Sequence, residues 1–68
     1  MLDWRSRVGK NIRSLREARG LTQENLAVDA KIDLTYLGGI ERGRRNPSLL
    51  VMVRIAGALD VDVKQLLV

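Results

Sequence analysis

The side chains with the strongest chemical character in this chain are arginines, and they gather in one short segment. Residues 42–46 read Arg-Gly-Arg-Arg-Asn, so three guanidinium groups occur within four positions. A guanidinium donates paired hydrogen bonds to phosphate or carboxylate oxygens. The sequence lacks histidine and cysteine, and it shows neither a phosphate-binding glycine loop nor a credible pair of catalytic carboxylates. This pattern argues against an enzyme and favours binding of an anionic partner; an ordinary solvated basic face is the alternative.

The length and composition describe one small domain. A chain of 68 residues with 46% hydrophobic residues is globular and too short to build two cores, so we expect a single domain over residues 1–68. Without cysteine it has no disulfide and no thiolate zinc site, and we expect no metal and no cofactor. It has neither an apolar run of about 18 residues nor the apolar segment of a secretory signal, which predicts a soluble cytoplasmic protein without membrane contact.

The elements that must position the arginines are helices. Trp4, Val8, Ile12 and Leu15 recur at helical spacing, and Gly20 supplies a stop signal for that helix. Side chains suited to N-caps precede the later helices: Thr22, Asp33, Ser48 and Asp62. The expected helices cover residues 4–19, 23–30, 34–42, 49–59 and 63–67. The sequence therefore predicts a compact all-α domain of five helices, with no β-hairpin signal.

Two short helices joined by a three- or four-residue turn form the architecture that places a second helix in the DNA major groove. From residue 8 to residue 67 the chain resembles the Cro and lambda-repressor-like (Xre) helix-turn-helix family. The strings that carry the resemblance are residues 21–27 (LTQENLA), 35–37 (TYL), 40–43 (IERG), 45–48 (RNPS) and 58–61 (ALDV). Within that family, residues 32–42 look most like the controller proteins of restriction-modification systems.

This resemblance implies a dimeric, sequence-specific transcriptional regulator of bacterial or phage type, with the helix-turn-helix itself at about residues 22–43. Two recognition helices about 34 Å apart would read a palindromic operator in double-stranded DNA. We expect a homodimer, no small-molecule substrate and association with the bacterial nucleoid. The alternative is an antitoxin-like or coactivator-like module that holds a protein partner and binds DNA only secondarily.

The resemblance also assigns residues to the DNA. The positions that face base edges are Asp33, Leu34, Thr35 and Gly39. The positions that lie at the sugar-phosphate backbone are Thr22, Gln23, Tyr36, Gly38, Arg42, Arg44, Arg45 and Asn46. Three alternatives stay open, because Asp33 also suits an N-cap, Leu34 also suits a partner surface, and Gln23 also suits plain solvation.

Arg16 and Glu41 match a pair that forms a buried ion pair between the first and third helices in family members, where it orients the recognition helix. The chain departs from the family at Lys31, where the turn usually carries glycine, and at Gly38 and Gly39, which replace polar or basic side chains. The two glycines either let the helix backbone approach DNA closely or leave two reading positions blank.

The helix expected at residues 49–59 is almost wholly apolar, and Arg54 is the only charged residue between Ser48 and Asp60. A short domain cannot cover every face of such a helix, which indicates a surface for a second copy. The candidate interface residues are Leu50, Val51, Val53, Val61, Val63 and Val68. Tighter packing within one monomer is the alternative.

Overall fold

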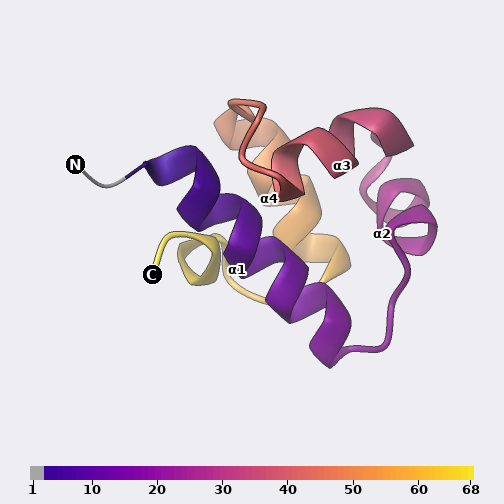
Figure 1. Cartoon of the computed structure of the whole chain (residues 1–68). Helices are drawn as coiled ribbons and strands as arrows, with labels where there is room; N and C mark the ends of the chain where they lie inside the picture. Colours follow the sequence, from indigo (N-terminus) through magenta and orange to yellow (C-terminus); the bar gives the residue numbers. More distant parts are fainter. Residues whose placement is uncertain (1–2) are drawn as a thin grey trace.

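The computed structural model describes residues 3–68 as an all-α fold in which α4 packs against α2 and η1 and forms one side of the molecule (Figure 1). The elements are α1 (Trp4–Ala18), α2 (Gln23–Ala30), α3 (Leu34–Glu41), α4 (Leu49–Ala58) and the 3₁₀ helix η1 (Val63–Leu66). The predicted count of five α-helices is wrong, because the last element is a single 3₁₀ turn. The predicted domain starts at residue 1, and its first two residues lie outside the described part.

Each helix begins where an N-cap side chain accepts a hydrogen bond from a free backbone N–H, and the sequence predicted every cap except that of α1. The caps are Asp3, Thr22, Asp33, Ser48 and Asp62. Three helices end one residue before the predicted limit, at Ala18, Glu41 and Ala58. Left-handed residues follow these ends within two positions, namely Gly20, Gly43 and Asp60. The chain turns sharply there and the helices stop.

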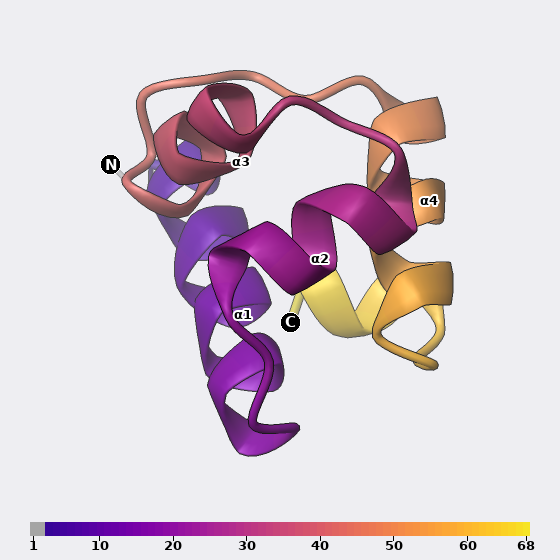
Figure 2. The same ribbon diagram turned by 90° about the vertical axis from the view of Figure 1, so that its right-hand side faces the viewer.

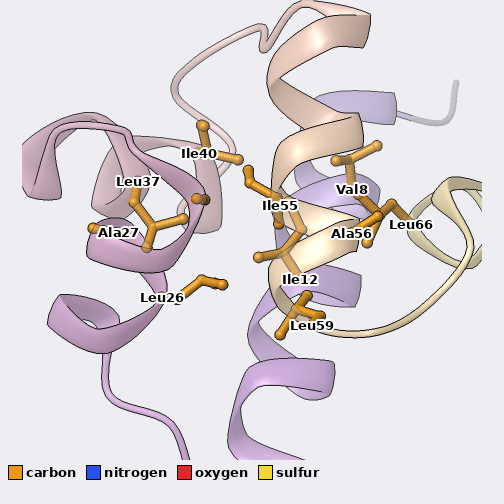
Figure 3. Close-up of a cluster of buried hydrophobic side chains, with 11 residues drawn as sticks. Val8, Ile12, Leu26, Ala27, Leu37, Ile40, Ile55, Ala56, Leu59 and Leu66 are labelled. Carbon is orange, nitrogen blue, oxygen red and sulfur yellow. The ribbon is translucent and has the colours of Figure 1, made fainter.

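The core is aliphatic and lies between α4 and the other elements. Its largest fully buried side chains are Ile12, Leu26, Leu37, Ile40, Ile55, Leu59 and Leu66. In Figure 3 these side chains converge from all four helices and from η1. A chain with two aromatic residues thus fills its interior with leucine and isoleucine.

Trp4 is not part of this core, although its spacing predicted a buried position. Its side chain is 52% exposed, and the Arg7 guanidinium carbon lies 5.4 Å from the ring centroid. Trp4 occupies the first position of α1 and lines a surface pocket with Pro47 and with Met52 of α4. The helical period identified the correct face, but the core does not extend to its first turn.

A close crossing of α1 and α3 fixes the orientation of α3. A β-carbon built on Gly9 would collide with the carbonyl oxygen of Ile40 and lie 2.8 Å from the carbonyl oxygen of Glu41. No side chain other than that of glycine fits at this crossing, so the backbones of α1 and α3 are in direct contact. The C-terminal half of α3 is therefore held against α1, while its N-terminal half extends toward the surface.

Candidate nucleic-acid interface

The turn between α2 and α3 is tight and carries a left-handed residue. Lys31 has φ 59° and ψ 45°, the conformation at which the family pattern has glycine. The amide of Ile32 donates to the carbonyl oxygen of Ala27 at 3.0 Å and closes the turn. A left-handed non-glycine residue costs about 1–2 kcal/mol, so the chain keeps the geometry of the turn at some expense in stability.

The N-terminus of α2 is fixed by a reciprocal capping box. Thr22 Oγ1 accepts from the amide of Asn25 at 3.0 Å, and Asn25 Oδ1 accepts from the amide of Thr22 at 3.3 Å. Sequence reasoning missed Asn25, although its place three residues after a threonine N-cap is the signal for this motif. The first turn of α2 is consequently ordered before any ligand arrives.

The first turn of α3 presents its side chains to solvent. Leu34 is 42% exposed, Thr35 is exposed and Tyr36 is half-buried. The Asp33 carboxylate accepts from the amide of Tyr36 at 3.1 Å, so this side chain acts as the N-cap. Contact of these residues with DNA bases stays a prediction.

Beneath this surface, Arg16 of α1 and Glu41 of α3 form a two-pronged ion pair. Arg16 Nε and Glu41 Oε2 lie 2.8 Å apart, and Arg16 Nη2 and Glu41 Oε1 lie 3.0 Å apart. The side chains are only 11% and 2% exposed. Hydrogen bonding to Glu41 raises the pKa of the Arg16 guanidinium above its usual value. The guanidinium therefore keeps its charge throughout the accessible pH range.

Gln23 joins this ion pair, which the sequence did not indicate. Its amide Nε2 donates to Glu41 Oε1 at 3.0 Å and thereby connects α2 to α3. The side chain is half-buried, and its remaining amide hydrogen and Oε1 are the groups that could reach a phosphate. The predicted phosphate contact of Gln23 is untested, but the side chain has a fixed orientation.

The two consecutive glycines of α3 lie underneath arginine side chains. A β-carbon built on Gly38 would lie 3.3 Å from Arg42 Nη1, and one built on Gly39 would lie 2.8 Å from Arg45 Cγ. Both glycines are buried, whereas both arginines are exposed. In the free protein the surface of α3 at these positions is thus formed by arginines from the end of the helix and from the following segment.

The segment from α3 to α4 carries the remaining predicted backbone contacts. Figure 2 shows it running from the end of α3 across to the start of α4. Arg44 and Asn46 are exposed on it, and Pro47 is buried. None of the ion pairs among residues 3–68 involves Arg42, Arg44 or Arg45. Three uncompensated positive charges therefore lie beside the exposed part of α3.

The predicted dimer surface divides into exposed and half-buried residues. Leu50, Val53 and Val68 are 67%, 47% and 62% exposed, and Leu49, which the sequence did not single out, is 64% exposed. The three other candidates pack partly against the core: Val51, Val61 and Val63. The apolar surface most open to a partner consequently lies on the first half of α4.

Across residues 3–68 we find no helix with the length and hydropathy needed to cross a bilayer. The same residues bring no three acidic side chains together in an arrangement suited to a metal ion.

Comparison with known proteins places the chain in a family. A family model described as "Helix-turn-helix" matches residues 12–66. The transcriptional regulator y4dJ of Sinorhizobium fredii is 41% identical over 61 residues, which are 90% of this chain and 79% of the relative. The immunity repressor of Bacillus phage phi105 is 46% identical over 56 residues, but these are 82% of this chain and only 39% of the repressor.

Among solved structures, the restriction-modification controller protein C.AhdI from Aeromonas hydrophila superposes with a TM-score of 0.89 and is 44% identical. The match covers 91% of this chain and 94% of the controller protein. The family model thus matches the segment that carries the sequence strings, and the controller protein shares the fold. The chain therefore belongs to the Cro and lambda-repressor-like helix-turn-helix family of DNA-binding transcriptional regulators.

Proposed function

We propose that this regulator binds a palindromic operator as a homodimer and acts as a controller protein of a restriction-modification system. The observation that carries the proposal is the single surface formed by the exposed first turn of α3 and the three unpaired arginines beside it. In this proposal Leu34 and Thr35 would face base edges, and Arg42 and Arg44 would contact phosphates. The likeness to C.AhdI supports the controller role.

Dimerisation is proposed from the apolar surface of α4. Leu49, Leu50 and Val53 are large, exposed and close together on the first half of one helix. Contiguous apolar surface of this kind marks an interaction site, and a two-fold interface pairs the same patch of both copies. A dimer would present two copies of α3 to DNA, which is the arrangement that a palindrome requires.

The proposal is tested by selecting binding sites from random oligonucleotides with the purified protein. We expect a palindrome to be enriched, and sedimentation of the complex to show two protein chains for each duplex. Binding to the selected site at two salt concentrations should show a steep loss of affinity with salt, because phosphate contacts displace counterions.

No enriched sequence, together with weak and salt-sensitive binding alone, would contradict the proposal. That result would favour the interaction module, for which the small number of polar reading side chains on α3 is the supporting observation. A monomer at tens of micromolar in sedimentation experiments would reject the dimer and with it the palindrome.

A further inference from the structure

At Gly39, which has no side chain, the surface of α3 is covered by the side chain of Arg45 from the following segment. A β-carbon at Gly39 would lie 2.8 Å from Cγ, 3.2 Å from Nε and 3.5 Å from Cδ of Arg45. The stem of Arg45 thus occupies the space in which a side chain at position 39 would begin. Any residue other than glycine at position 39 would displace Arg45 from the helix.

The end of the Arg45 side chain is also held in place. Its guanidinium carbon lies 5.9 Å from the centroid of the Tyr36 ring, within the range of a cation–π contact. Tyr36 is half-buried, so the ring is itself packed. None of the ion pairs among residues 3–68 engages the guanidinium, and its donors stay available to a ligand.

Arg45 lies beside the side of α3 that would face the bases. Gly39 follows Thr35 by four positions and Tyr36 by three, so the three residues are neighbours on one side of the helix. Arg45 therefore lies next to the exposed first turn of α3. Arg44, which precedes it in the chain, is exposed and stacks on no aromatic ring within residues 3–68.

We propose that Arg45 supplies the base contact that position 39 lacks, with its guanidinium donating to O6 and N7 of a guanine in the major groove. This inference rests on the proposed function, since it requires α3 to enter the groove of a specific operator. Neutralising a phosphate requires little fixed geometry, whereas the two parallel donors must be aligned with the edge of a base. Glycine destabilises a helix relative to alanine, and at position 39 it leaves the space that the Arg45 side chain occupies.

The test compares Arg45→Ala with Arg44→Ala on the operator selected by the wild-type protein. Arg45→Ala should lose preference for guanine at one symmetric pair of positions, where the wild type discriminates by about 5- to 150-fold. Arg44→Ala should weaken all sequences alike and lower the salt slope by about one contact, without changing any base preference. A uniform loss for Arg45→Ala, with guanine preference retained, would overturn the inference and leave the proposed function intact. No selected operator for the wild type would overturn both.

A double-mutant cycle tests the role of the glycine. Gly39→Ala favours the helix and meets only a flexible side chain, so the variant should fold with unchanged circular dichroism. It should reduce the same guanine preference in the wild type and have no further effect on that preference in the Arg45→Ala background. If Gly39→Ala had equal effects in both backgrounds, Gly39 itself would contact the DNA. That result would overturn the inference that the glycine acts by leaving space for Arg45.

Discussion

Replacing Glu41 by alanine should unfold a large part of the population, because this carboxylate supports two other side chains in the interior. It accepts from Arg16 Nε at 2.8 Å, from Arg16 Nη2 at 3.0 Å and from Gln23 Nε2 at 3.0 Å. In the variant, Arg16 keeps only its bond to the carbonyl oxygen of Leu21, while its side chain is 11% exposed. A buried charge without its partner costs about 3–5 kcal/mol. At roughly 0.05–0.15 kcal/mol per residue, a domain of this size has only about 3–10 kcal/mol in total.

The assay is urea denaturation followed by far-ultraviolet circular dichroism. The matched control is Glu17→Ala, which breaks an exposed ion pair to Arg13 at 3.3 Å with side chains 56% and 63% exposed. We expect the control to lose less than about 1 kcal/mol. Replacing Arg16 and Glu41 together by methionine and leucine should restore most of the stability, since no unpaired charge stays in the interior. A loss below about 1 kcal/mol for Glu41→Ala, similar to that of the control, would refute the argument from burial.

Three further changes test the turn, the helix crossing and the partner surface. Lys31→Gly should raise the free energy of unfolding by about 0.5–1 kcal/mol by relieving the left-handed strain, and a lower urea midpoint would contradict this. Gly9→Ala should destabilise by about 2 kcal/mol or more because its methyl group meets the backbone of α3, whereas Gly57→Ala, with open space around it, should stabilise by up to about 1 kcal/mol. Leu50→Glu should yield a folded monomer in sedimentation experiments, and an unchanged dimer would remove the first half of α4 from the interface.

Local signals were sufficient to predict the helices. The apolar period and the cap residues Thr22, Asp33 and Ser48 gave the starts of α2, α3 and α4 at the residues where they occur. The predicted ends of α1, α3 and α4 were one residue too late. The last helical residue and the C-cap that follows it differ only in their backbone hydrogen bonds, which a sequence pattern does not reveal. The C-terminal element was expected as an α-helix, but the amides of Gln65 and Leu67 donate to carbonyl oxygens three residues back, which makes it a 3₁₀ turn.

The interface was harder to predict, because its contacts join residues without a fixed spacing. The placement of Arg45 over Gly39 depends on the path of the loop after Gly43, which no helical period describes. The bond from Gln23 to Glu41 likewise joins two helices across the turn. A sequence pattern identifies which residues share a helix face, whereas the loop path and the crossing angle decide which faces meet.

The bond from Gln23 to Glu41 has a consequence for how the domain would engage DNA. Glu41 at the end of α3 is held by Arg16 of α1 and by Gln23 at the start of α2, so one carboxylate connects three helices. A phosphate contact at the start of α2 would set the position of the domain on the duplex, while base contacts from α3 would set its sequence preference. Because both elements share Glu41, neither moves without the other. If the proposed contacts form, the phosphate contact at the start of α2 would determine the depth at which α3 enters the groove.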